Sequence, residues 1–186
     1  ARVTTAVSVS GLNPGATLGR YELPPRTTSN DFMAEVQRRH PGRILGVAGI
    51  DVSNQFHDAL NELERCATTL GLRAVFIEPG RAPGCLLNDR RLYPLYERCQ
   101  DLKLTLIPQT SGVLGGRLVD YASPRYIEEV ADDFPRLHIV CGHGCYPYVR
   151  EALVMASRRD NVWLSPDSYF FHLGHEDWFR AVNLNL

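Results

Sequence analysis

The chain has 186 residues, enough for one domain with a buried core, and its 44% hydrophobic and 22% charged residues are typical of a globular protein. A formal net charge of −1 argues against nucleic acid or an anionic membrane as a partner. No apolar run reaches the roughly 18 residues of a membrane span, and the first residues lack a signal-peptide pattern. We expect a single domain over residues 1–186.

Short, nearly continuous apolar runs rich in β-branched residues predict six strands. In chain order these are Val3–Val9, Ile44–Ile50, Ala74–Ile77, Leu104–Ile107, His138–Cys141 and Val162–Leu164. Amphipathic spacing predicts helices over Asn30–Arg39, Phe56–Leu70, Leu92–Leu102, Pro124–Phe134 with Ser123 as N-cap, Pro147–Arg158 and Glu176–Val182. The segment Gly11–Arg26 holds three prolines and three glycines and is predicted to be an irregular loop.

The alternation of strands and helices predicts parallel βα units. Six such units are too few for a closed eight-stranded barrel, and an open doubly wound sheet is the other possibility. Neither a GxGxxG motif nor a P-loop follows any strand, so nucleotide binding has no positive support.

The five cysteines, Cys66, Cys85, Cys99, Cys141 and Cys145, form no CxxC pair, which argues against a zinc ribbon or a thioredoxin motif. Cys141 and Cys145 flank His143 and suggest a metal site, but Cys141 ends an apolar strand and is better interpreted as a core residue. Free thiols without a signal peptide favour a cytoplasmic location.

Polar residues follow the predicted strands, where the reactive groups of parallel βα folds collect. The candidate catalytic residues are Glu78, His143 and Asp167, and the candidate substrate-binding residues are Asn13, Gln109 and Tyr169. Carboxylates, an amide and an imidazole at one mouth can form an acid–base set. Lys103, the single lysine, precedes its strand and so lies at the opposite end.

Each candidate also has a structural interpretation. His143 stands between two glycines after a buried strand, and we favour a functional role over that of a turn residue. Glu78 is equally well read as a loop charge, and Asp167 as a cap of the following segment. Gln109 could bind substrate or satisfy loop backbone groups.

Four stretches resemble the amidohydrolase-2 family of metal-dependent hydrolases and decarboxylases, which adopt a distorted TIM barrel. They are residues 89–96 (DRRLYPLY), 133–140 (DFPRLHIV), 142–144 (GHG) and 161–165 (NVWLS). The resemblance extends from about Gly46 to Asn183. It implies an α/β, TIM-barrel-like fold, an incomplete barrel of about six parallel strands with outer helices, corresponding to strands two to seven.

The resemblance also implies a divalent metal such as zinc, but the ligand set of this chain does not support one. The family's HxH pair on the first strand is absent, and the chain stops before the metal-binding aspartate of the eighth strand. The fifth-strand histidine falls at Gln109, which leaves only His143 as a weak metal candidate. Catalytic zinc normally takes three protein ligands.

Two functions are compatible with these observations. The first is an amidohydrolase-like hydrolase, or a related decarboxylase, acting on a small carboxylated or lactone substrate with His143 as acid or base. The alternative is an inactive homologue or barrel fragment that lacks the metal site. Unpaired parallel edges of a six-stranded sheet predict a homo-oligomer or a partner that supplies the missing segment.

Overall fold

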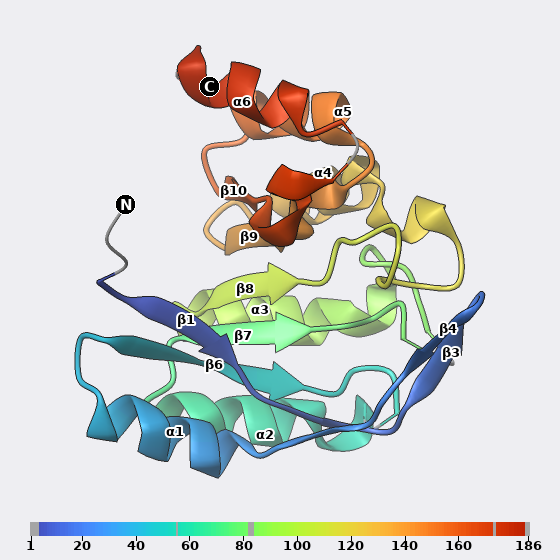
Figure 1. Ribbon diagram of the computed structural model, residues 1–186. Helices are drawn as coiled ribbons and strands as arrows, with labels where there is room; N and C mark the ends of the chain where they lie inside the picture. Colours follow the sequence, from blue (N-terminus) through green and yellow to red (C-terminus); the bar gives the residue numbers. More distant parts are fainter. Residues whose placement is uncertain (1–3, 55, 82–83, 173, 185–186) are drawn as a thin grey trace.

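Six parallel strands form a curved half-barrel in the computed structural model, which describes residues 4–54, 56–81, 84–172 and 174–184. The strand order is β1-β6-β7-β8-β9-β10. Their bounds are Ala6–Val9, Ile44–Ile50, Ala74–Ile77, Thr105–Pro108, His138–Gly142 and Val162–Ser165, respectively. The predicted incomplete barrel is therefore confirmed (Figure 1). Of the strand predicted over Val3–Val9, Ala6–Val9 form β1, Thr4 and Thr5 precede it, and Val3 lies outside the described residues.

The helices pack on the convex side of the sheet. Their bounds are Asn30–Arg39 (α1), Phe56–Thr68 (α2), Tyr93–Asp101 (α3), Pro124–Asp133 (α4), Val149–Arg158 (α5) and Glu176–Asn183 (α6), with 3-10 turns η1 to η4 at Arg90–Leu92, Val119–Ala122, His143–Cys145 and Asp167–Phe171. Ser123 occupies the expected N-cap position of α4, but its side chain makes no capping hydrogen bond. None of the described helices combines the length and apolar character needed to cross a membrane.

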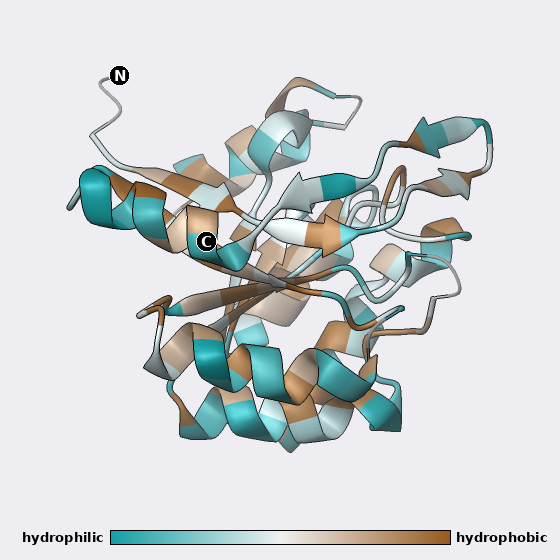
Figure 2. Cartoon of the chain, turned by 90° about the horizontal axis from the view of Figure 1, so that it is seen from below, coloured by the Kyte–Doolittle hydropathy of each residue, from teal (hydrophilic) through white to brown (hydrophobic). Residues whose placement is uncertain are grey.

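The core lies between the strands and the helices because side chains alternate along each strand. Val75 and Ile77 of β7 face the helices and are almost fully buried, as are Leu106 of β8 and Ile139 of β9. Phe76 points to the opposite, concave face. Figure 2 shows the result, with brown strands at the centre and teal surfaces on the outer helices.

The prediction of an irregular loop over Gly11–Arg26 is wrong. The segment folds into β2 (Gly11–Asn13), β3 (Ala16–Leu18) and β4 (Tyr21–Leu23), and β5 (Arg26–Thr28) follows directly. β2 pairs with β5 and β3 with β4, both antiparallel. The resulting extension projects beyond the carboxyl ends of the parallel strands (Figure 1). These strands have three residues each, too few to show the alternation that predicts a strand.

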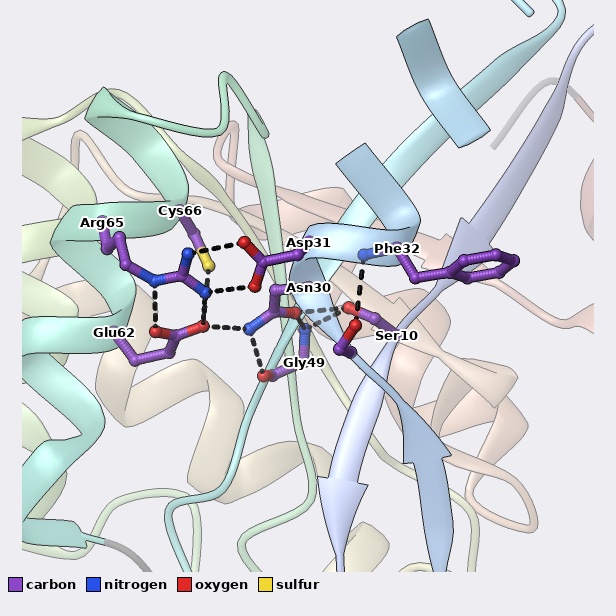
Figure 3. A network of polar contacts seen from close by, with 9 residues as sticks. Ser10, Asn30, Asp31, Phe32, Gly49, Glu62, Arg65 and Cys66 are labelled. Carbon is purple, nitrogen blue, oxygen red and sulfur yellow. Dashed lines mark hydrogen bonds and ion pairs between the residues drawn. The ribbon is translucent and has the colours of Figure 1, made fainter. Parts of the chain in front are cut away.

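A buried polar network fixes the carboxyl end of β1 to β6 and to the first two helices (Figure 3). Asn30 Oδ1 accepts from the Ser10 hydroxyl at 2.5 Å and from Gly49 N at 2.9 Å. Asn30 Nδ2 donates to Glu62 at 2.7 Å, and Arg65 binds the same carboxylate. Only glycine fits at position 49, because a Cβ there would lie 2.1 Å from Ser10 O. The network thus sets where β1 ends and the extension begins.

Candidate functional site

The carboxyl ends of the parallel strands carry the predicted site residues. Glu78 and Gln109 each follow directly after a strand, β7 and β8, and are almost fully buried. Their positions have the same parity as Phe76 and Ile107, two residues that line the cavity on the concave side. Strand alternation therefore directs both side chains toward the concave side at the strand ends, although neither lines the cavity itself.

His143 and Asp167 lie together at this mouth, although 24 residues separate them. Asp167 Oδ2 accepts from the backbone N–H of His143 at 3.1 Å and lies 3.4 Å from its ring atom Nδ1. Asp167 Oδ1 accepts from the Ser165 hydroxyl at 2.6 Å. Among the described residues Nδ1 has no hydrogen-bond partner, and Asp167 at 3.4 Å can pair with the ring when the ring is protonated.

Both residues of this pair adopt an unusual backbone conformation. His143 has a φ of 70° and Asp167 a φ of 52°, in the left-handed region that costs a residue with a Cβ about 1–3 kcal/mol. Histidine and aspartate tolerate it better than bulkier residues do. Two strained residues in direct contact at a strand end are typical of a functional site, and this strain was not foreseen for Asp167.

The electrostatic environment favours the neutral form of the His143 ring. Burial lowers the pKa of His143 below its ordinary value of 6.5, while Asp167 and Glu78 act to raise it and Arg26 acts to lower it. The ring also meets Tyr169 edge to face, with centroids 5.6 Å apart. A neutral imidazole beside a carboxylate can accept a proton at neutral pH.

A cavity of about 1370 Å³ extends over the strands and reaches this mouth, where Arg26, His143, Ser165 and Asp167 line it. Apolar strand residues form part of its wall, and charged residues of α1 and of the loops at the amino ends of the strands form another part. A large hollow in which a few polar groups converge can admit a small molecule.

Glu78 sits in an ionic cluster that the sequence did not predict. Arg26 binds it side-on, with Nε 2.8 Å from Oε2 and Nη2 3.0 Å from Oε1. Asn13 Nδ2 donates to Oε2 at 3.1 Å, and Nη1 of the buried Arg81 lies 3.5 Å from Oε1. Arg81 in turn donates to the carbonyls of Pro14 and Pro24. Since both carboxylate oxygens have partners, the cluster holds the β2–β5 extension against β7.

The three predicted substrate-binding residues have different surroundings. Asn13 supports Glu78, as described. Gln109 Oε1 accepts from Ser111 N at 3.2 Å. Tyr169 is buried, stacks on Tyr146 at 4.3 Å and shares a 2.6 Å hydrogen bond with the Ser111 hydroxyl. Neither Gln109 nor Tyr169 lines the large cavity, whereas His143 and Asp167 do.

The residues at this mouth do not form a zinc site on their own. In the described part of the chain, no three His, Cys, Asp or Glu side chains are grouped to hold a metal ion. Glu78 is bound to arginines, and Cys141 and Cys145 are fully buried. His143 and Asp167 remain as donors, fewer than the three that catalytic zinc requires.

Arg26 is the site residue that sequence reasoning missed. A carboxylate expected inside a barrel needs a cationic partner, and with Lys103 at the wrong end that partner had to be an arginine. The chain has 19 arginines, however, and the choice depends on a pairing across 52 residues that no local pattern reveals.

Comparisons with known proteins agree with this architecture. A family model described as "Amidohydrolase" matches residues 17–182. An uncharacterized TIM-barrel protein, Bb4693 from Bordetella bronchiseptica, is 34% identical over 97% of this chain with a TM-score of 0.81, and this chain spans 60% of that protein's length.

More distant structures share the fold alone. 4-Oxalomesaconate hydratase from Rhodopseudomonas palustris is 23% identical over 74% of this chain and 47% of its own, with a TM-score of 0.56. Dihydroorotase from Campylobacter jejuni is 15% identical over 80% of this chain and 43% of its own, with a TM-score of 0.51. No curated protein gives a match. The family model covers most of the chain, and the chain therefore belongs to the amidohydrolase family.

Proposed function

We propose that the chain acts as an amidohydrolase-like hydrolase on a small carboxylated or lactone substrate, with His143 as general acid–base. One observation carries the proposal: a half-buried imidazole lies beside Asp167 at one end of a large cavity. Family membership supports the reaction class. No step of the proposal depends on a metal, because the described residues offer too few ligands.

The reaction balances with these two residues alone. His143 takes a proton from water as the water oxygen attacks the lactone carbonyl carbon, and the carbonyl π electrons move to oxygen. Asp167 stabilises the imidazolium formed. As the carbonyl re-forms, the ring C–O bond breaks and His143 returns the proton to the leaving oxygen. The product is a hydroxy acid, and in this scheme Glu78 positions Arg26 rather than transferring protons.

Hydrolysis of a lactone releases acid, so titration at constant pH measures it directly. We would compare paraconate, a lactone that carries a carboxylate, with γ-butyrolactone, which does not. His143→Asn should lower the rate about 100-fold or more, since general acid–base catalysis contributes about 10²–10⁴-fold. Asn also suits the left-handed backbone at this position.

His57→Asn is the matched control, because His57 is exposed at the start of α2. It should hydrolyse paraconate at the wild-type rate. Equal rates for wild type and His143→Asn would refute the role of His143. No hydrolysis of any carboxylated or plain lactone by the wild type would favour the alternative, an inactive homologue or barrel fragment.

A further inference from the structure

We propose that Arg26 is the carboxylate-binding, specificity-determining residue of the cavity, holding the substrate's carboxylate while Glu78 holds Arg26. This inference rests on the proposed function, because it assigns one end of the same substrate. Beyond that function, we assign the discrimination between carboxylated and neutral ligands to the contact between Arg26 and the ligand's carboxylate.

The hydrogen bonds of Arg26 leave one edge of its guanidinium unused. Nε and Nη2 each give one N–H to Glu78. A guanidinium has five N–H donors in a planar fork. The two N–H groups of Nη1 and the second of Nη2 therefore remain, and none has an acceptor among the described residues. The N–H groups along the edge formed by Nη1 and Nη2 can donate to both oxygens of a second carboxylate in a bidentate arrangement.

The position of Arg26 suits this role. Its side chain is 38% exposed, whereas the neighbouring Arg81 is 5% exposed and spends its donors on Glu78, Pro14 and Pro24. Arg26 lines the same cavity as His143, and its charge is close enough to lower the pKa of that imidazole. A ligand that spans the two residues would thus be held at one end and exposed to a base at the other.

The surroundings also fix the guanidinium in place. Its central carbon lies 5.4 Å from the ring centre of Phe76, which covers one face on the concave side. Side-on binding to the buried Glu78 sets its orientation in the plane. A cation that is orientated in advance binds an anion with less loss of side-chain entropy than a free surface arginine.

Equilibrium binding tests the inference without requiring turnover. We would titrate the chain with glutarate and with glutaramide, its neutral analogue, by isothermal calorimetry. The wild type should bind glutarate and discriminate against glutaramide at least about tenfold, as expected for a charge-assisted contact. Arg26→Gln should abolish that preference, and Arg26→Lys should retain part of it.

Arg26→Gln leaves Glu78 without its main partner and can unfold the chain. We would therefore also measure the double variant Arg26→Gln/Glu78→Gln, which removes both charges of the pair. Arg180→Gln, a change at an exposed arginine of α6, is the matched control and should bind as the wild type does. Glutarate binding by the folded double variant with wild-type affinity would overturn the inference, as would equal binding of glutarate and glutaramide by the wild type.

His143→Asn separates this inference from the proposed function. It should still bind glutarate in preference to glutaramide while losing paraconate hydrolysis. Arg26-dependent glutarate binding in a chain that hydrolyses no lactone would refute the proposed function and leave the carboxylate site standing.

Discussion

Replacing Glu78 by Gln tests whether this residue is mainly a structural anchor. The side chain is 8% exposed, and the substitution keeps its shape while removing the charge that faces Arg26 and Arg81. Loss of one partner from a buried ion pair costs about 3–5 kcal/mol. Arg26 is partly solvated, and Arg81 keeps two carbonyl acceptors, so both charges stay partly satisfied. We therefore expect Glu78→Gln to lower the free energy of unfolding by about 2–4 kcal/mol.

Urea unfolding followed by circular dichroism measures this change. Glu97→Gln, at an exposed position of α3, is the matched control and should alter the free energy of unfolding by less than about 0.5 kcal/mol. A loss below about 1 kcal/mol for Glu78→Gln would show that the cluster contributes little to stability. Glu78 would then have to be reconsidered as a catalytic carboxylate.

Three further predictions concern the network, the pH dependence and metal. Asn30→Ala removes one buried and three part-buried hydrogen bonds and should lower the free energy of unfolding by about 2–4 kcal/mol. Asn183→Ala, at an exposed position, should change it by less than about 0.5 kcal/mol in the same urea assay. Burial lowers the pKa of His143 in the folded state, so the unfolded chain binds more protons than the folded chain just below pH 6.5. The contribution of His143 to the free energy of unfolding is therefore present above that pH and is lost as the pH falls toward the lowered pKa. The stability difference between wild type and His143→Asn should therefore vary with pH in that window, and a constant difference would contradict the argument. Chelation by EDTA should leave the thermal unfolding midpoint unchanged, while a marked drop would reveal ligands that the described residues do not show.

The parallel sheet was predictable from sequence because its strands are buried against the helices, and this burial requires apolar runs that are visible in the sequence. Ile44–Ile50 and Ala74–Ile77 form strands with the predicted bounds, since continuous apolar runs leave little choice of register or end. The β2–β5 extension was not predictable. Its strands are three residues long, and they are held by long-range contacts such as Arg26 to Glu78 rather than by a local pattern.

The candidate site divides in the same way. The positions of Glu78, Gln109 and His143 follow from the rule that polar groups gather at the carboxyl ends of parallel strands. Their partners do not follow from it. The contact of Asp167 with His143 depends on two left-handed residues, and the contact of Glu78 with Arg26 depends on an extension that was expected to be irregular. Sequence patterns thus located the mouth but not its ionic connections.

The concave face leads to a prediction about assembly. Val7, Leu45 and Trp163 are 60%, 51% and 46% exposed, and Val7 pairs with Leu45 in the register of β1 and β6. Trp163 shares the concave side with Ser165 through strand alternation. Among the described strands, β1 and β10 each have a neighbour on one side only. Exposed apolar surface beside unpaired edges favours association, and we expect a second copy of this chain to cover the part of the cavity lined by Val7 and Leu45 while leaving the mouth at His143 open. Sedimentation velocity over a range of concentrations should show a dimer or larger species that Leu45→Glu dissociates. Leu60→Glu on the outer face of α2, where Leu60 is 40% exposed, should leave the species intact. A wild type that sediments as a monomer at every concentration would mean that this apolar face is tolerated in water, and the prediction would be wrong.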